Sequence, residues 1–199
     1  QSIIDKITGG SKLALNDPML KDQYSHQITK ANEAWALVKN NPEITVAIVD
    51  TGVDAKHPDL KDRMVAGYSA YPGEEAGVDK QGHGTHCAGI AAAVPNNGVG
   101  VAGVAVGNIK IQPVKVLSNS GSGTYAAVAD GIAWAATHGA KVLSMSLGGP
   151  SSSQAIDDAV ALAIKNDAIV IAATGNSGAA AGCSYPACTP GVTPVGATD

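Results

Sequence analysis

The sequence predicts an α/β protein of three layers, with a mostly parallel sheet between helices on both faces. Two observations support this class. Short apolar, β-branched segments alternate along the chain with longer segments whose apolar residues recur at helical spacing. The short segments are apolar almost without interruption, which is typical of parallel strands buried on both faces. The 199 residues are enough for one sizeable core or for most of a larger domain.

Five segments have the composition of strands. The first, ITVAIVD at 44–50, is apolar and β-branched, so we expect a buried parallel strand there. Pro113 lies inside the second segment, and because proline has no amide hydrogen we expect an irregularity at that point. The four further strands are expected at 109–117, 140–147, 168–174 and 192–198, of which the last has the weakest pattern.

Three helices are expected between these strands. One begins at Thr124 and ends before Gly139, which supplies a C-terminal stop. Another begins behind the serines at 151–153, which offer a cap for its first turn. The third begins near His83, and its residues are small and apolar all round, so we expect it to be buried.

The composition excludes several classes of protein. With 45% hydrophobic and 15% charged residues, the chain is globular rather than disordered. Its net charge of −4 offers no basic surface for nucleic acid or anionic membranes, which we therefore do not expect as partners. No apolar run reaches the roughly 18–20 residues of a membrane helix. The chain begins QSIIDKITGG, so we expect any signal peptide to have been removed.

No linker or internal repeat divides the chain. We expect residues 1–15 to form a loosely attached arm and residues 16–199 to belong to a single domain. Residues 72–82, PGEEAGVDKQG, are predicted to form a surface loop. The chain stops at Asp199, one residue after a strand-like segment, so we expect the domain to be incomplete at its C-terminus.

The three cysteines are Cys87, Cys183 and Cys188, and an odd number argues against a full disulfide scaffold. Cys183 and Cys188 are close enough along the chain to bridge the SYPA loop between them. A bridge there would fit an oxidising compartment, and two reduced thiols are the alternative.

Asp50 ends the first predicted strand, in VDTGV. In α/β sheets, chemistry collects at the carboxyl ends of the strands, although a lone aspartate there more often caps the following turn. Asp-Thr-Gly also occurs in aspartic proteases, which are all-β proteins that need a second such carboxylate. The chain has no second Asp-Thr-Gly and no Asp-Ser-Gly, so we set that interpretation aside.

His83 lies in QGHGTHCAGIAAA at 81–93, where the glycines on either side allow a tight turn into a helix and leave the ring free. His86 follows three residues later, and the pair could also ligate a metal. A metalloprotease helix would instead need four-residue spacing with an intervening glutamate, which this stretch lacks. For a lone histidine the plainer interpretation is a hydrogen-bonded structural residue.

Asn176 follows the fourth predicted strand, in AATGNSG. A side-chain amide at that place can donate to an oxygen that gains negative charge, although an Asn in a Gly-Ser turn is usually only a turn residue. GVGVAG at 98–103 matches the dinucleotide-binding pattern, but a helix precedes it and a strand follows it. We therefore expect no dinucleotide cofactor.

Together these motifs resemble those of the subtilisin-like serine proteases (subtilases), and in particular the thermitase-like bacterial branch. The resemblance extends from Asn16 to Asp199 and rests on VDTGV, HGTHCAG, SLGG at 146–149 and ATGNSG, which occur in the order and spacing of the family. It implies that Asp50 is the carboxylate of a catalytic triad, His83 the general base and Asn176 the oxyanion donor. Asp50 would fix one ring nitrogen of His83, and the other would face a hydroxyl.

The resemblance also implies where a peptide substrate binds. An extended peptide or unfolded protein would lie between two backbone edges and pair with their main chains. The edges would be Gly121, Ser122, Gly123 and Ser146, Leu147, Gly148, with Ala173, Thr174 and Gly175 shaping the pocket for the side chain before the cut, which we expect to accept large apolar groups.

A calcium site is implied in the same way, because Ca²⁺ prefers a mixed shell of carboxylate and carbonyl oxygens. It would pin the N-terminal arm to the loop PNNGVGV. Without the resemblance, Asp59 in HPDL would be taken to cap a turn. The implied ligands are the carboxylates of Asp17 and Asp59, the amide oxygen of Asn97 and the carbonyls of Val94, Val99 and Val101.

One catalytic residue of the family, the nucleophile, has no counterpart in this chain. The family's nucleophile is a serine in Gly-Thr-Ser-Met, and no such motif occurs in this chain. Cys87 lies directly after HGTH, but we expect a buried packing residue there rather than a nucleophile. We therefore expect a secreted, extracellular serine endopeptidase whose serine lies beyond residue 199, with this chain alone inactive. The alternative is a non-catalytic module that binds peptides.

Overall fold

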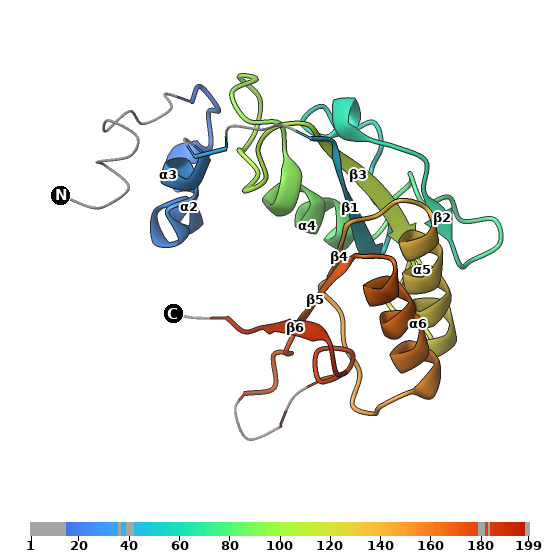
Figure 1. Ribbon diagram of the computed structural model, residues 1–199. Helices are drawn as coiled ribbons and strands as arrows, with labels where there is room; N and C mark the ends of the chain where they lie inside the picture. Colours follow the sequence, from blue (N-terminus) through green and yellow to red (C-terminus); the bar gives the residue numbers. More distant parts are fainter. Residues whose placement is uncertain (1–14, 36, 39–41, 179–181, 183, 198–199) are drawn as a thin grey trace.

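The computed structural model describes residues 15–35, 37–38, 42–178, 182 and 184–197, and the strands within this part of the chain form one parallel sheet (Figure 1). The strand order is β2-β3-β1-β4-β5-β6. The strands are β1 Ile44–Asp50, β2 Tyr68–Ser69, β3 Ile109–Lys115, β4 Val142–Met145, β5 Ile169–Ala173 and β6 Val192–Val195.

The three predicted helices are present and lie on opposite faces of the sheet. They are α4 His83–Ala92, α5 Tyr125–Thr137 and α6 Gln154–Lys165, with α4 on one face and α5 and α6 on the other (Figure 1). This confirms the predicted α/β class. Not predicted were β2 and the short helices α2 Tyr24–Thr29 and α3 Ala31–Trp35, because two to six residues are too few to show a period. Two 3₁₀ turns, Leu20–Asp22 and Lys61–Arg63, complete the elements, and most of the expected arm, residues 1–14, lies outside the described residues.

Several predicted strands are shorter in the structure, and β3 shows the reason. The amide of Val116 still donates to the carbonyl of Asp50 at 2.9 Å, but the amide of Leu117 turns back to the same carbonyl at 3.1 Å, so the ladder ends after Lys115. Pro113 remains inside β3 opposite Ile48. On its other side β2 pairs only with residues 114–115, so the missing amide hydrogen leaves no gap in that ladder.

The helix caps follow the sequence in one case and not in another. The Thr124 hydroxyl accepts from the amide of Ala127 at 3.1 Å, as expected for a cap. Ser153 occupies the same position before α6, but its side chain makes no capping hydrogen bond. The prediction of a serine side-chain cap there is therefore wrong, and Asp157 supplies the negative charge in the first turn instead.

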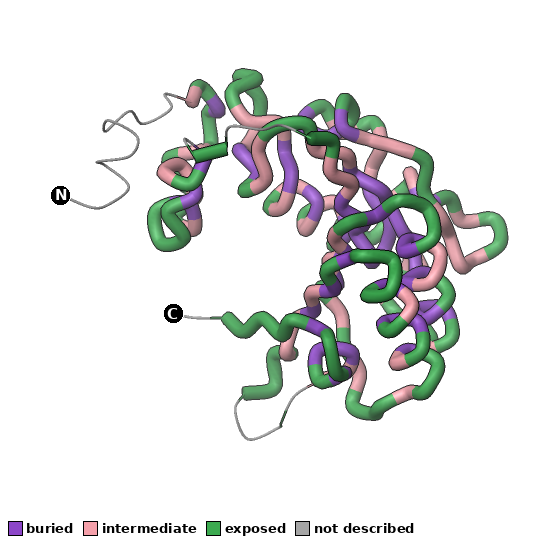
Figure 2. The backbone as a smooth tube through the Cα atoms, in the orientation of Figure 1, coloured by how far each residue is buried: buried purple, intermediate pink, exposed green. Residues whose placement is uncertain are grey.

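The core has two parts, one on each face of β1. Ala47 and Val49 point toward α5 and α6, whereas Val46 and Ile48 point toward α4. Figure 2 shows the buried residues concentrated along the strands and on the sides of the helices that face them. Because side chains alternate across a strand, a strand buried on both faces must be apolar throughout, as 44–50 is.

The strand order places a crevice at the end of β1. The chain passes from β1 to β3 on one side, and then to β4 on the other side of β1. Connections that leave a strand in opposite directions separate at its carboxyl end, which is where α/β proteins bind ligands. Asp50 is the residue at that end.

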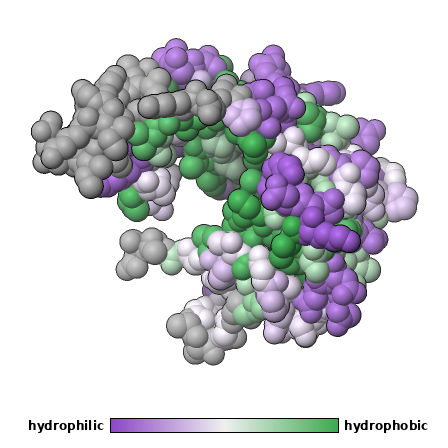
Figure 3. Space-filling model, in the orientation of Figure 1, coloured by the Kyte–Doolittle hydropathy of each residue, from purple (hydrophilic) through white to green (hydrophobic). Residues whose placement is uncertain are grey.

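Apolar side chains remain exposed on the face of the sheet that carries α4. Hydrophobic residues gather around a hollow on that side of the molecule (Figure 3). Among the exposed apolar residues are Ile90 of α4, Ile169 of β5 and Val195 of β6. Within the part of the chain that the structure describes, no helix has the length and apolar character needed to cross a membrane.

Replacing Leu143 with Ala tests the core of the sheet. Leu143 is fully buried in β4, so we expect a loss of about 2–5 kcal/mol in the free energy of unfolding, measured by urea denaturation. Ile169→Ala, in the neighbouring strand but 58% exposed, should change it by about 0.5 kcal/mol or less. Equal losses from the two substitutions would contradict the placement of Leu143.

Candidate active site

Asp50 is a buried carboxylate at the end of the central strand, with only 1% of its surface exposed. A buried charge is costly unless hydrogen bonds satisfy it. The amide of Thr51 donates to Oδ1 at 2.7 Å, and the ring of His83 supplies the other contact. The backbone turn after β1 and the first turn of α4 therefore meet at this carboxylate.

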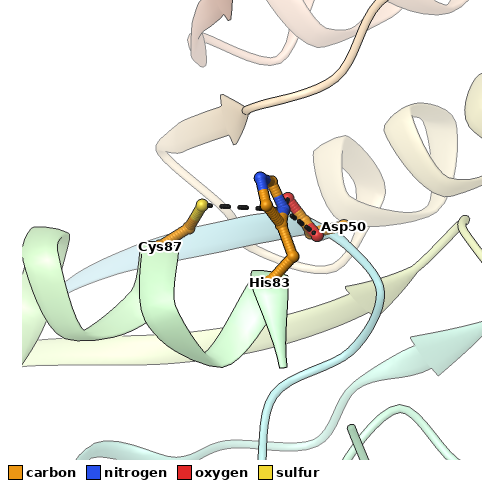
Figure 4. A group of neighbouring side chains, drawn as sticks. All are labelled: Asp50, His83 and Cys87. Carbon is orange, nitrogen blue, oxygen red and sulfur yellow. Dashed lines mark hydrogen bonds and ion pairs between the residues drawn. The ribbon is translucent and has the colours of Figure 1, made fainter. Parts of the chain in front are cut away.

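His83 begins α4 and points its ring at Asp50 (Figure 4). Its Nδ1 lies 2.7 Å from Oδ1 and 2.9 Å from Oδ2 of Asp50. An ionised carboxylate can only accept hydrogen bonds, so Nδ1 carries the proton and donates it. In the neutral tautomer that donates from Nδ1 the lone pair lies on Nε2, and with 42% of the side chain exposed the imidazole is accessible from solvent.

Glycines permit this close approach of helix and strand. Gly82 precedes the helix with a φ of +96°, a conformation that favours glycine, as the sequence predicts. A Cβ on Gly84 would collide with the carbonyl oxygen of Gly52 and lie 3.1 Å from the Cβ of Asp50. Any larger residue at Gly84 would therefore push α4, and His83 with it, away from Asp50.

Cys87 lies one turn further along α4, with its Sγ 3.9 Å from Nδ1 of His83 (Figure 4). It packs against the α4 core cluster but is only half-buried, so the prediction of a buried residue is wrong in degree. Burial raises the pKa of the thiol, as do the charges of Asp50 and Asp79, and these outweigh the hydrogen bond with Ser146. The thiol therefore stays protonated near neutral pH, which disfavours nucleophilic attack.

A metal site at this position is the other possibility. Asp50, His83 and Cys87 each offer one ligand atom, and these atoms lie within 4.8 Å of one another. A cysteine ligates a metal as the thiolate, which the raised pKa opposes. The Nδ1 of His83 is moreover committed to Asp50. His86 is exposed and is not part of this group.

A cleft of about 540 Å³ joins His83 to two of the predicted backbone edges. It is lined by Gly121, Ser122 and Gly123 on one side and by Ser146, Leu147 and Gly148 on the other. The structure therefore brings the candidate base and both predicted substrate edges into one depression. A peptide lying along either edge would pass beside the imidazole.

The third predicted stretch adjoins the cleft without lining it. Ala173 ends β5, and Asn176 lies in the exposed turn that follows. Met145 pairs with Ala172 in the sheet, so the chain leaves β4 and β5 side by side. Ser184 lies between the two exits, because a Cβ on Gly148 would meet its Cβ at 2.9 Å and one on Gly175 would meet its Oγ at 2.5 Å. Thr174 is held by its amide, which donates to Val195 at 3.0 Å.

Several cleft residues were not predicted. Gln81, Tyr125 and Tyr185 line the cleft, together with apolar side chains from α5 and α6. The Tyr125 hydroxyl also accepts from the amide of Ser151 at 3.1 Å. The sequence signal for the two tyrosines is their aromatic side chains, and Tyr125 stands at the first position of α5. The sequence does not show which elements meet at the cleft, so this signal alone could not place them there.

Asp17 and Asp59, predicted as calcium ligands, both reach the loop that follows α4. Asp17 and Asp59 are 5% and 1% exposed. The amides of Asn96 and Asn97 donate to Asp17 at 2.8 and 3.2 Å. Asp59 does not cap its own turn; its Oδ1 accepts from the side chain of Asn97 at 2.8 Å. Two buried carboxylates therefore converge on one loop.

The rest of the predicted ligand set lies in the same loop. Val101 donates its amide to Oδ2 of Asp59 at 3.0 Å, and Val94 donates to the carbonyl of Asp59 at 3.1 Å. Val99 donates to the amide oxygen of Asn97 at 2.8 Å. The structure thus brings the six residues together, with the carboxylates held by N–H groups. Oxygen atoms are the only ligand type that this set offers, which suits a hard cation such as Ca²⁺.

The structure describes only one of the two cysteines of the predicted bridge between Cys183 and Cys188. Cys188 is disulfide-bonded, whereas Cys183 lies outside the described residues. Cys87 is a free thiol. The partner of Cys188 therefore stays a prediction.

The chain is similar in sequence to known proteins over most of its length. The chain is 45% identical to thermitase from Thermoactinomyces vulgaris over 185 residues, which cover 92% of this chain and 65% of thermitase. It is 44% identical to subtilisin DY from Bacillus licheniformis over 179 residues, which cover 88% of this chain and 64% of that protein. The chain thus spans less than two thirds of the length of these relatives.

The model of the Subtilase family matches residues 41–199. The match contains the strand that ends in Asp50, the helix that begins at His83 and both edges of the cleft. With a family match over most of the sequence and relatives at this identity, the chain belongs to the subtilase family.

Proposed function

We propose that this chain is the N-terminal portion, residues 16–199, of the catalytic domain of a secreted serine endopeptidase, and that Asp50 and His83 are two members of its triad. The observation that carries the proposal is the contact of 2.7 Å between Nδ1 of His83 and the buried Asp50. That contact leaves Nε2 as the basic nitrogen, beside a cleft with two peptide-binding edges.

In this mechanism His83 removes the proton of a serine hydroxyl through Nε2 as the oxygen attacks the peptide carbonyl. Asp50 holds Nδ1–H and stabilises the imidazolium that forms. His83 then returns the proton to the leaving amine, and water later hydrolyses the acyl-enzyme by the same route in reverse. Asn176, in the exposed turn that follows β5, would donate to the oxyanion.

In this proposal the serine comes from polypeptide outside this sequence, because the chain contains no Gly-Thr-Ser-Met. The chain corresponds to 65% of thermitase, which leaves room for such a segment. Exposed apolar residues on the face of the sheet that carries α4 offer it a surface for packing (Figure 3), and Ile90 and Ile169 are among the exposed apolar residues of the chain. Because the members of a triad act as a unit, we expect the chain without that segment to hydrolyse no peptide by this mechanism.

The proposed substrate is an extended peptide or an unfolded protein. Residues 121–123 and 146–148 would pair with its main chain, which gives affinity with broad tolerance for sequence. Ala173, Thr174 and Gly175 are small and would leave room for a large apolar side chain before the cut. Their position alongside residues 146–148 supports this assignment.

Calcium is proposed as a structural ion bound by Asp17, Asp59 and Asn97, with carbonyls of the loop that follows α4. The buried carboxylates and the oxygen-only donor set support this site. The ion would offset the repulsion between two buried negative charges and fix the segment around Asp17 to the loop. Secretion is supported by the disulfide-bonded Cys188, because such bonds persist in oxidising compartments.

The proposed mechanism is tested with a fluorophosphonate probe on the longer polypeptide that supplies the serine. The wild type should be labelled on that serine, and His83→Ala should reduce kcat by about 10⁶-fold, the loss known for a triad member in the relative subtilisin. His86→Ala, an exposed residue of the same helix, is the matched control and should keep normal labelling. Specific peptide binding without labelling would contradict the protease and support the binding module.

The calcium site is tested by thermal unfolding with Ca²⁺ and with a chelator. We expect Ca²⁺ at about 100 times its Kd to raise the free energy of unfolding by about 2.7 kcal/mol. Asp59→Asn should abolish this gain, whereas Asp62→Asn, an exposed carboxylate three residues away, should retain it. If Asp59→Asn does not fold, Asp17→Asn replaces it. Equal unfolding temperatures with Ca²⁺ and with chelator would refute the site.

The state of Cys87 is tested by the pH dependence of its alkylation with iodoacetamide. Because folding raises the pKa of this thiol, the midpoint in the folded chain should lie above the ordinary value of 9.0. The denatured chain, in which Cys87 is no longer partly buried, serves as the control and should react faster at pH 8. A midpoint below 9.0 in the folded chain would restore Cys87 as a candidate nucleophile.

A further inference from the structure

The first turn of α4 carries backbone N–H groups that have no partner within the helix. Gly82, the residue before the helix, has no side chain to accept them. Three side chains outside the helix accept them instead: Gln81 from the amide of His83 at 2.8 Å, Thr51 from Gly84 at 2.9 Å and Asp79 from Thr85 at 2.9 Å. The helix that presents the candidate base is therefore held by its surroundings.

Asp79 has the most contacts of the three. Its Oδ2 also accepts from the hydroxyl of Thr85, at 2.7 Å. Its Oδ1 accepts from the hydroxyl of Thr51 at 2.9 Å and from the amides of Gln81 and Gly82 at 3.1 and 2.8 Å. One carboxylate thus ties the loop before α4, the first turn of α4 and the residue after Asp50.

Thr51 completes the connection to the buried carboxylate. Its amide donates to Asp50 at 2.7 Å, and its carbonyl accepts from the buried Lys115 at 2.6 Å. Its hydroxyl donates to Asp79 and accepts from Gly84. A continuous set of hydrogen bonds therefore runs from Asp50 through Thr51 and Asp79 to the helix that begins with His83.

We propose that Asp79 is a positioning residue that fixes the separation and orientation of Asp50 and His83. This inference rests on the proposed function, in which that separation matters for proton transfer. Asp79 does not line the cleft. It acts through Thr51 and through the first turn of α4, so its role is to hold the two groups rather than to react.

The protonation state of Asp79 suits this role. Partial burial would by itself raise the pKa of this carboxyl, but the hydrogen bonds from Thr85, Gly82 and Thr51 outweigh it and hold the pKa below the ordinary value. The group is then a carboxylate that only accepts, facing hydroxyl and amide donors. A negative charge at this end of α4 also matches the helix dipole.

Asp79→Asn tests the proposal, because it keeps the shape but turns a donor toward N–H and O–H groups. The readout is the NMR signal of the Nδ1 proton of His83 in the ¹⁵N-labelled chain, assigned through its loss in His83→Ala. Wild type and Glu75→Gln, an exposed acid of the same loop, should show the signal. Asp79→Asn should lose it to exchange with water while still unfolding cooperatively. An unchanged signal in Asp79→Asn would overturn the proposal.

Thr85 offers a second variant if Asp79→Asn does not fold. Thr85→Val removes the hydroxyl that donates to Asp79 and should weaken the signal, whereas Thr85→Ser keeps that donor and should retain it. An equal signal in Thr85→Val and Thr85→Ser would count against the network.

Kinetics of the longer polypeptide separate positioning from folding. Asp79→Asn should lower kcat by about 10²-fold, the size expected for a misplaced catalytic group, with little change in KM. A change confined to KM would overturn the positioning role. A wild type that shows the His83 signal but hydrolyses no peptide would refute the proposed function alone.

Discussion

The hydrogen bond between Asp50 and His83 is the contact on which the rest of the site depends. It joins two residues that are 33 positions apart in the chain, one at the end of a strand and one at the start of a helix. The contact forms only because β1 is covered on both faces and because Gly84 lets α4 come close to it. The contact between Asp50 and His83 therefore requires both an apolar strand β1 and small residues in α4.

Buried charges organise the loops around this contact. Asp50 is satisfied by the amide of Thr51 and Asp79 by Gly82 and Thr85, whereas at the other end of α4 Asp59 is satisfied by Asn97 and Val101. The buried Lys115 pairs with Glu74 at 3.2 Å and donates to the carbonyls of Thr51 and Leu117. Because an unsatisfied buried charge is costly, these loops are held in place by the charges they satisfy.

The parallel sheet brings the two proposed substrate edges to the same end. The amides of Val116 and Leu117 both donate to the carbonyl of Asp50, which starts the segment that reaches 121–123. Residues 146–148 continue from β4, whose neighbour β5 leads into Ala173 and Asn176. The exposed turn around Asn176 adjoins the cleft but does not line it. Asp50, His83 and the two proposed peptide edges therefore share one end of the sheet, whereas Asn176, the proposed oxyanion donor, lies on a turn.

The sequence by itself determined the local features. The apolar runs identified five of the strands, the cap at Thr124 and the stop at Gly139 bounded a helix, and the glycines beside His83 indicated its tight turn. The resemblance to the subtilases, carried by the order of the motifs, pointed to Asp50 and His83, which the structure places in contact, and to the two segments that line the cleft. Short elements such as α2 and β2 showed no period, and the serines before α6 predicted a side-chain capping hydrogen bond that does not form. Only the tertiary structure decided which distant groups meet: that Asp79 holds α4, that Lys115 is buried under Thr51, and that Cys87 is half exposed. The physical reason is that such contacts depend on strand order and on the approach of α4, which no local pattern of residues encodes.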